Sequence, residues 1–308
     1  MSTIFGLYFN LPSELRMMVI NEMKPDDRCR FTRCSKLCNK EAKASRNYIY
    51  ELEIREISTQ IIVVKAVFGQ EDEKCYGFSV TFEEQQNGRK CMTWAKLYRE
   101  KLCRCELDTS TNIFESSSAY FKDLLKIYQN TIKQLWIYGT GFKANFNFEI
   151  ERLKNLEALA VEARFLPQFL PKTRYPLKVL EVYGEDGSEY LGRCEKVLQV
   201  QQRIFLPYAN LNYTQFLQLS AKELFINIGQ MTEENIADFL KSWQNGERGE
   251  HLRRCTWILK SPFDVQRIAQ FLGATQNEYG NYRINHLKDI GKSITLTHRG
   301  LLIICEWD

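Results

Sequence analysis

Thiols and imidazoles are the side chains of this sequence that could do nucleophilic chemistry. The 308-residue chain holds ten cysteines and three histidines, at positions 251, 286 and 298. Thiol catalysis pairs a cysteine with a histidine base, and Cys255 follows His251 by four residues, a spacing that makes two side chains neighbours in a helix. The surrounding pattern instead places Cys255 inward in a strand, where related segments carry leucine. We therefore interpret Cys255 as a core thiol and predict no catalytic residue.

Metal and nucleotide sites have equally little support in the residue pattern. The cysteines are scattered, Cys103 and Cys105 being the closest pair, and His251, His286 and His298 all lie in the last sixty residues, so the four clustered ligands of a zinc site are not expected. No G-x-S-x-G, Walker A or G-x-G-x-x-G sequence is present. We expect no metal, no cofactor and no enzymatic activity.

Composition is that of a folded protein with a core, 44% hydrophobic and 13% aromatic. The net charge of +4 is small, and basic residues alternate with acidic ones, so we do not expect a nucleic-acid partner. No run approaches the ~18 apolar residues of a membrane span. The first ten residues lack a basic leader, and the cysteines lack disulfide spacing, so a cytoplasmic or nuclear location is expected.

The residue pattern divides the chain into three segments, 1–48, 49–118 and 119–308. The first is helical: Pro12 stands at a helix start, and Leu15, Met18, Val19 and Met23 recur at helical spacing. Two shorter helices are expected after residue 25. Such a small module buries little apolar surface by itself, so we expect it to pack against a partner protein or against the next domain.

The pattern of the middle segment predicts β-hairpins. Runs at 48–54, 61–68 and 76–82 are β-branched and aromatic, with turn residues at Gly69 and at Asn87-Gly88. The polar stretch from Asp108 to Ser118 is interpreted as a loop or linker.

An internal repeat marks the third segment, residues 119–308. One template, apolar-x-x-apolar-x-apolar, recurs with its middle position at residues 135, 159, 180, 224 and 255, in steps of 24, 21, 44 and 31. The step of 44 spans about two units, with a degenerate strand at Ile204. This spacing is typical of leucine-rich-repeat units, each a strand followed by a helix or turn. We predict an α/β fold (α+β overall) of such strand–helix repeats, closed by a C-terminal hairpin of residues 292–297 and 301–307; a non-repetitive α/β sheet is the alternative.

Leu11-Pro12-Ser13-Glu14-Leu15, with Val19-Ile20, Met23, Phe31 and Cys34-Ser35-Lys36, resembles an F-box in order and spacing. Cys34-Ser35-Lys36 stands where that family has a Val-Cys-Arg-like triplet, and Arg28 and Cys29 replace residues that are usually aliphatic. The resemblance implies docking on a Skp-type adaptor. The residues assigned to this contact are Leu11, Pro12, Leu15, Val19, Ile20, Met23, Phe31 and Cys34. The alternative is that the same apolar stripe packs on the chain's own β region.

Residues 120–308 are diffusely similar to the F-box-associated region of nematode-type F-box proteins, through Thr232-Glu233-Glu234, Phe239-Leu240-Lys241-x-Trp243 and the ending Trp307-Asp308. That resemblance implies a substrate receptor of a Skp–cullin–RING ubiquitin ligase whose C-terminal region recruits an unidentified target protein. A repeat scaffold that binds protein or nucleic acid without a ligase role is the alternative.

In strands of the repeat template the leucine positions face the core, so alternate residues project to the opposite face. That face would hold Trp136, Tyr138, Tyr183 and Phe225, and exposed aromatic side chains are common anchors of protein interfaces. We predict these four as target-binding residues. If helices covered both faces, the same residues would be core.

Overall fold

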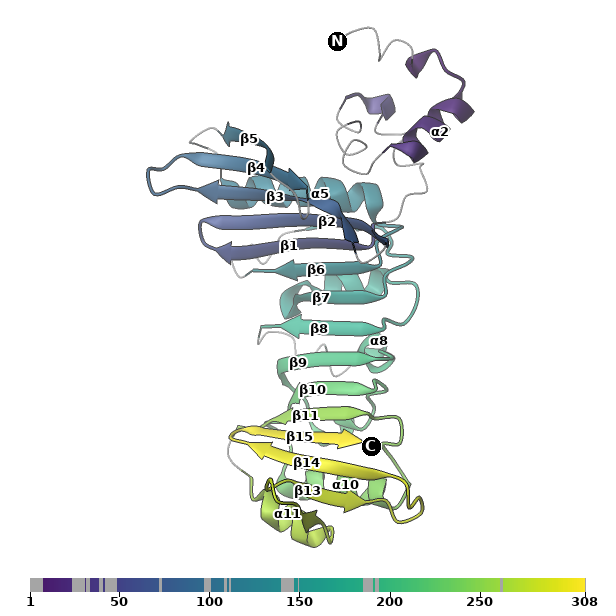
Figure 1. Cartoon of the computed structure of the whole chain (residues 1–308), viewed down its shortest axis with the longest axis vertical. Coiled ribbons are helices and arrows are strands. Elements are labelled where there is room, and N and C mark those ends of the chain that lie inside the picture. The colour runs from purple at the N-terminus through teal and green to yellow at the C-terminus, as the bar shows by residue number, and fades with distance from the viewer. Residues whose placement is uncertain are drawn as a thin grey trace. The chain divides into compact units, whose positions relative to one another are not determined.

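The computed structural model describes residues 8–23, 31, 34–38, 41, 49–71, 74–96, 101–107, 110, 112–139, 147–148, 150–184, 191, 194–260 and 263–307 (Figure 1). The chain divides into two compact units, Met1–Leu156 with Pro171–Tyr175 (unit 1) and Glu157–Leu170 with Pro176–Asp308 (unit 2). These limits differ from the boundaries expected at residues 48 and 118, so the division into three domains stays a prediction from the residue pattern.

A small helical module opens unit 1. Helix α2 (Ser13–Glu22) is its longest described element. Its Ile20 joins Tyr8, Phe31 and Cys38 in a core of its own, against which Met17 and Met23 also pack. Of the second and third predicted helices, residues 31, 34–38 and 41 are described, whereas Arg28 and Cys29 lie outside the described residues.

The remainder of unit 1 is a sheet with the strand order β6-β1-β2-β3-β4-β5. Its strands are β1 (Glu51–Ser58), β2 (Ile61–Glu71), β3 (Lys74–Glu84), β4 (Lys90–Lys96), β5 (Lys101–Leu107) and β6 (Gln134–Tyr138). Strands β1 to β5 are antiparallel to their neighbours, and β6 runs parallel to β1. The predicted hairpins are thus confirmed, but the turn expected at Gly69 is wrong, because Gly69 lies inside β2 opposite Tyr76. The period-two pattern of the hairpins buries alternate residues, such as Ile62, Val64 and Ala66 of β2.

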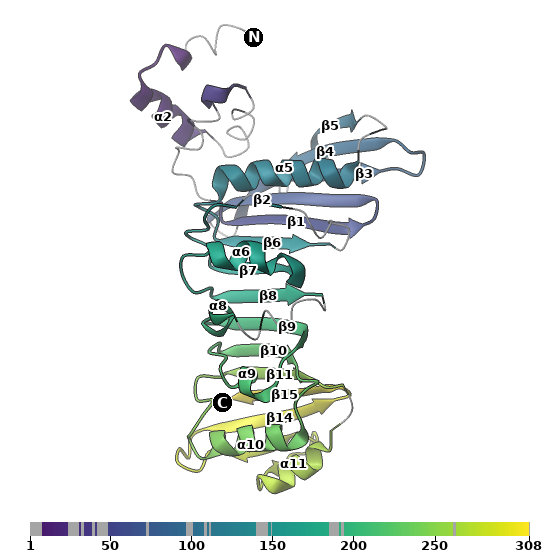
Figure 2. The same ribbon diagram turned by 180° about the vertical axis from the view of Figure 1, so that it is seen from behind.

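Helix α5 (Ile113–Tyr128) corrects the prediction of a loop from Asp108 to Ser118, because it begins inside that polar stretch. The Asn112 side chain caps it by accepting the backbone N–H groups of Phe114 (2.9 Å) and Glu115 (3.3 Å). Ser117 and Ser118 are buried, and the Ser117 hydroxyl donates to the Phe114 carbonyl at 3.1 Å. Local hydrogen bonds therefore let a polar sequence start a helix that covers one face of the sheet (Figure 2).

Unit 2 contains parallel strands β7 (Ala158–Glu162), β8 (Val179–Tyr183), β9 (Arg203–Asn210), β10 (Glu223–Asn227) and β11 (Arg254–Ile258). The pairing sets the middle positions of the sequence template side by side. Leu159, Leu180, Ile204, Leu224 and Cys255 are register partners from strand to strand, and all five are buried. The spacing seen in the sequence therefore corresponds to one inward-facing row, and the strand expected near Ile204 is confirmed.

Short helices follow these strands in the chain. They are η1 (Ala163–Phe165), α6 (Leu166–Phe169), η2 (Leu170–Lys172), α8 (Glu195–Leu198), α9 (Tyr213–Phe216), α10 (Glu233–Gln244) and α11 (Val265–Phe271). A capping box begins α10: the Thr232 hydroxyl accepts the Asn235 N–H at 3.3 Å, and the Asn235 side chain accepts the Thr232 N–H at 3.1 Å.

The C-terminal hairpin is also confirmed, as β14 (Ser293–Arg299) and β15 (Leu302–Trp307). Strand β15 pairs antiparallel with β11, opposing Cys305 to Cys255, and β13 (Tyr282–Asn285) and β12 (Thr275–Gln276) extend the order beyond β14. The turn between β14 and β15 uses Gly300 at φ +61°, a left-handed conformation that glycine adopts without strain. The chain is therefore a mixed α/β protein. Within the described ranges, no helix has both the length and the apolar character to cross a membrane.

Candidate interaction surfaces

The residues at both ends of helix α2 determine where it begins and ends. Pro12 precedes it, and its carbonyl accepts the Arg16 N–H at 3.0 Å; a proline here loses no helical hydrogen bond. Glu14 in the first turn complements the positive end of the helix dipole. The helix ends at Glu22, and the N–H of the next residue, Met23, donates to the Val19 and Ile20 carbonyls.

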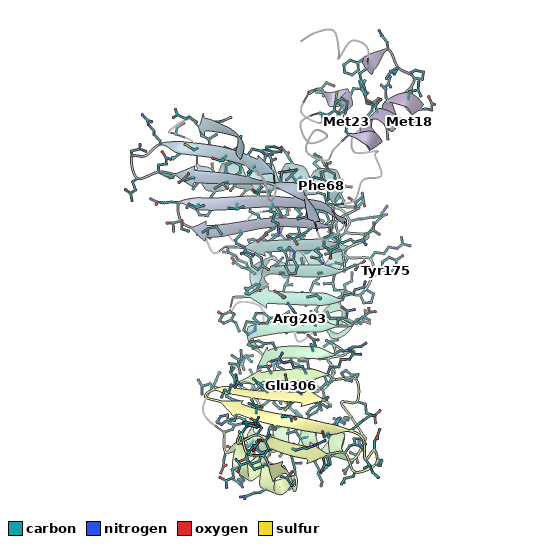
Figure 3. The ribbon with its side chains drawn as sticks, in the orientation of Figure 1. Met18, Met23, Phe68, Tyr175, Arg203 and Glu306 are labelled. Atoms are coloured by element: carbon teal, nitrogen blue, oxygen red, sulfur yellow. The ribbon has the colours of Figure 1, made fainter. Side chains whose placement is uncertain are left out.

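Two opposite faces of α2 are apolar. Successive residues turn about 100° around a helix axis, so Leu15, Met18 and Val19 share one face while Ile20 points to another. Ile20 is fully buried, whereas Leu15, Met18 and Val19 are 46%, 62% and 39% exposed, and Met18 projects outward (Figure 3). We call these three residues the α2 ridge. One apolar face of α2 thus packs into the core of the module, and the other is exposed to solvent.

The residues predicted to contact a Skp-type adaptor fall into two groups. Pro12, Leu15, Val19 and Cys34 are exposed, and Leu11 is half-buried. Ile20 and Phe31 are buried inside the module, and Met23 is half-buried against its core. Their docking roles stay predictions. Met18, the most exposed of the three ridge residues, was missed as a contact residue although its spacing of three from Leu15 marks it.

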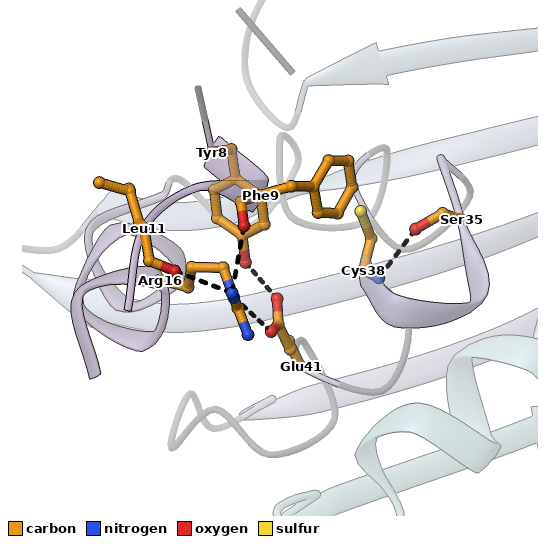
Figure 4. Close-up of polar contacts among 7 residues, drawn as sticks. All are labelled: Tyr8, Phe9, Leu11, Arg16, Ser35, Cys38 and Glu41. Atoms are coloured by element: carbon orange, nitrogen blue, oxygen red, sulfur yellow. Dashed lines mark hydrogen bonds and ion pairs between the residues drawn. The ribbon is translucent and has the colours of Figure 1, made fainter. Parts of the chain in front are cut away.

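A hydrogen-bonded cluster, which we call the polar bracket, links the start of α2 to the end of the module (Figure 4). Its members are Tyr8, Arg16 and Glu41. The Tyr8 hydroxyl donates to one oxygen of Glu41, and the Arg16 Nε donates to the other at 2.7 Å. Arg16 also donates to the Leu11 carbonyl at 2.8 Å. Burial, together with the bond to Glu41, raises the pKa of Tyr8 above its ordinary value. This raised pKa stabilises the fold below about pH 10, and the contribution is lost as the pH rises further.

Removing the charge of Glu41 is expected to loosen the module. In a Glu41→Gln variant, the largely buried Arg16 loses its charge partner and the Tyr8 hydroxyl a strong acceptor. Losses of this kind cost about 1–3 kcal/mol. Hydrogen exchange of residues 8–23 measures the effect, and faster exchange is expected. Glu14→Gln, which changes a fully exposed acid of the same helix, is the control; equal exchange in both variants would contradict the bracket's role.

A second surface lies on the strands of unit 2, on the face not covered by a described helix (Figures 1 and 2). Tyr183, Phe205 and Phe225 form an aromatic row across β8, β9 and β10. The rings of Phe205 and Phe225 stack with centroids 4.7 Å apart, and Tyr183 lies 5.7 Å from Phe205. All three are half-buried.

A carboxylate anchors this row. Glu181 is buried beside Tyr183, whose hydroxyl donates to it at 2.7 Å, and the Arg203 guanidinium donates to its second oxygen. The Tyr183 ring is therefore held by this hydrogen bond, which lowers the side-chain entropy that is lost when a partner binds it.

The four predicted target-binding residues do not form one described cluster. Tyr183 and Phe225 belong to the aromatic row. Trp136 and Tyr138 lie on β6 of unit 1, with stacked rings 6.3 Å apart and the Arg55 guanidinium 5.0 Å from the Tyr138 ring. Phe205, which joins Tyr183 to Phe225, was missed because its strand departs from the sequence template.

The remaining chemical candidate, Cys255, is a core residue as predicted. It is fully buried in β11, and burial, with Cys305 opposite, raises the pKa of its thiol. His251 is exposed on the preceding turn. A protonated thiol sealed in a core is not a nucleophile. Among the residues that the structure describes, no three potential ligands gather as a metal site would require.

The helical module with the exposed α2 ridge lies in a segment that comparison with protein families identifies: residues 9–50 match the F-box domain. The chain thus carries an F-box domain. It is distantly homologous to an uncharacterized F-box protein of Caenorhabditis elegans, with 22% identity over 286 residues that cover 85% of this chain and 73% of that protein. No solved structure matches the chain. F-box adaptors are typically non-catalytic, and no catalytic domain is identified in this chain.

Proposed function

We propose that this chain is the substrate-recruiting subunit of a Skp–cullin–F-box ubiquitin ligase, docking on a Skp-type adaptor through its N-terminal module. The observation that carries the proposal is the α2 ridge: three apolar side chains stand in solvent on the first long helix of the F-box match. Through the adaptor, the chain would join a cullin–RING assembly.

The size of the module supports docking by the ridge. The F-box match spans only residues 9–50, and a module of this length buries little apolar surface by itself. Burying Leu15, Met18 and Val19 under a partner helix would contribute about 25 cal/mol for each Å² of apolar surface removed from water. Leu11 and Pro12 would extend the contact, while Ile20 and Phe31 would support the ridge from beneath.

Co-expression with a Skp-type adaptor tests this assignment. The full chain should capture the adaptor, and a Leu11→Ala, Pro12→Ala variant should lose capture while circular dichroism reports an unchanged fold. Undiminished capture by the variant would show that docking uses another surface. Failure of the unaltered chain to capture the adaptor would favour a scaffold without a ligase role.

The proposal extends to unit 2 as a leucine-rich-repeat-like array whose helix-free face recruits the target protein. The in-register row of Leu159, Leu180, Ile204, Leu224 and Cys255 supports repeat units that stack their inward positions. The aromatic row supports the choice of face, since rigid, half-exposed aromatic side chains are the usual anchors of interfaces.

Truncating the aromatic row should remove target binding while the chain stays folded. Tyr183→Ala with Phe225→Ala deletes two half-buried rings and the Tyr183 hydrogen bond to the buried Glu181, so we expect a lower melting temperature but a cooperative unfolding transition. Cross-linking and mass spectrometry should then lose the protein partners that the parent chain captures, apart from the Skp-type adaptor. A partner list that is unchanged would place target binding elsewhere, for example at Trp136 and Tyr138.

A further inference from the structure

A pocket of about 540 Å³ lies in unit 1, away from the α2 ridge in sequence. It is lined by Glu151, Arg152, Lys154, Pro171, Lys172, Thr173 and Arg174. Four of these seven residues are cations and one is an acid. Neither the F-box match nor the aromatic row uses any of them.

One isolated β-bridge creates the cluster of cations. Leu153 pairs in parallel with Thr173, through a Leu153 N–H to Lys172 carbonyl bond of 2.9 Å and an Arg174 N–H to Leu153 carbonyl bond of 3.4 Å. Leu153 and Thr173 are buried, at 1% and 5% exposure. Because side chains alternate along an extended segment, the residues flanking each bridge partner face the solvent. Those residues are Arg152 and Lys154 on one segment, and Lys172 and Arg174 on the other.

The backbone of the pocket is fixed to the helix behind it. The Gln129 side chain, just after α5, accepts the backbone N–H groups of Glu151 at 3.0 Å and Arg152 at 3.4 Å. Gln129 is itself buried. The four cations are therefore held near one another by the fold before any ligand arrives.

Charge in the pocket is unbalanced. Over the described ranges, none of the four cations has an ion-pair partner, whereas other surface cations do, as Lys178 does with Glu157 at 2.7 Å. The Arg174 guanidinium lies 4.9 Å from the ring of the next residue, Tyr175, which is 54% exposed (Figure 3). Four cations against the single acid Glu151 leave an excess of positive charge, which forms a site for anionic oxygens.

We infer that this pocket binds an anionic peptide segment, bearing carboxylate or phosphate oxygens, of the protein that the chain recruits; the inference rests on the proposed role as a substrate receptor. A peptide fits better than a nucleic acid. Nucleic acids neutralise charge along a track of phosphates, whereas these cations are confined to one pocket, in a chain whose net charge is only +4. One exposed ring, already occupied by Arg174, also offers no stacking platform for bases.

Fluorescence anisotropy with the full chain tests the inference. The probes are a labelled peptide with four glutamates, its phosphoserine and glutamine counterparts, and a single-stranded DNA of equal charge. The pocket variant is Arg152→Gln with Arg174→Gln. The matched control is Lys126→Gln with Arg299→Gln, two exposed cations outside the pocket, which lowers the net charge equally. Melting temperatures of both variants establish that they are folded.

The parent chain should bind the glutamate or the phosphoserine peptide, and the glutamine peptide much more weakly. Binding should weaken about tenfold or more in the pocket variant, because charge-assisted hydrogen bonds are lost, and little in the control. The phosphoserine and glutamate peptides distinguish the two sources of anionic oxygens. Equal losses in both variants, no binding of either acidic peptide, or tighter pocket-dependent binding of DNA would overturn the inference. Capture of the Skp-type adaptor is measured in parallel, so failure here is distinguishable from failure of the docking proposal.

Discussion

Replacing Leu15 and Met18 of the α2 ridge by aspartate is expected to abolish capture of a Skp-type adaptor by the full chain. Both side chains stand in solvent, at 46% and 62% exposure, so charges there cost the free protein little. In a complex that covers the ridge, each carboxylate would be desolvated without a partner, a penalty of about 3 kcal/mol or more. The expected loss of affinity is therefore at least about a hundredfold.

A matched variant separates this effect from general damage. Ile57 on β1 and Ile290 in the loop before β14 are also exposed apolar residues, at 57% and 101%. Ile57→Asp with Ile290→Asp adds the same charge outside the ridge and should leave capture intact. Surface plasmon resonance against an immobilised adaptor gives both affinities. If the two variants lose affinity alike, the ridge is not the contact.

Trp257→Ala is expected to destabilise unit 2 by about 3–5 kcal/mol, the largest stability effect of any substitution proposed for this chain. The indole is fully buried on β11 and makes edge-to-face contacts with Phe216 of α9 and Phe239 of α10, at centroid distances of 6.0 and 6.1 Å. Removing it leaves a cavity between the sheet and its covering helices. Such cavities are costly because the surrounding structure relaxes only partly.

Trp257→Phe should cost much less than Trp257→Ala, for a polar reason as well as a steric one. The indole Nε1 has no hydrogen-bond acceptor within the described part of the chain, and an unsatisfied buried donor costs about 1–3 kcal/mol. Phenylalanine removes that donor while it keeps ring contacts with Phe216 and Phe239. Urea unfolding followed by far-ultraviolet circular dichroism measures both variants. Similar losses for Phe and Ala would mean that the indole N–H is satisfied.

Local patterns predicted the elements of this fold well. The spacing of Leu159, Leu180 and Leu224 indicated parallel strands, and the structure sets these residues in one register row. Runs of β-branched and aromatic residues predicted the strands β1 to β3 and their hairpins. Each of these features depends on residues close in sequence or on a repeated spacing, which a single sequence contains.

Features that depend on tertiary packing were not predictable in the same way. Val19 and Ile20 are adjacent and equally apolar, so sequence could not tell that one is exposed and the other belongs to the module's core. Helix α5 starts in a polar stretch because of the Asn112 cap, which outweighed composition. The basic pocket arises where Leu153 meets Thr173, twenty residues later, and no local pattern marks that bridge.

Isothermal titration of a Skp-type adaptor into the full chain, repeated at several temperatures, tests most directly whether the α2 ridge is a surface awaiting a partner. Burial of apolar surface on binding lowers the heat capacity. We predict one-to-one binding with a negative heat-capacity change that disappears in the Leu15→Asp, Met18→Asp variant. Absence of binding heat from the unaltered chain, or binding whose heat capacity is the same in that variant, would contradict the docking role of the ridge.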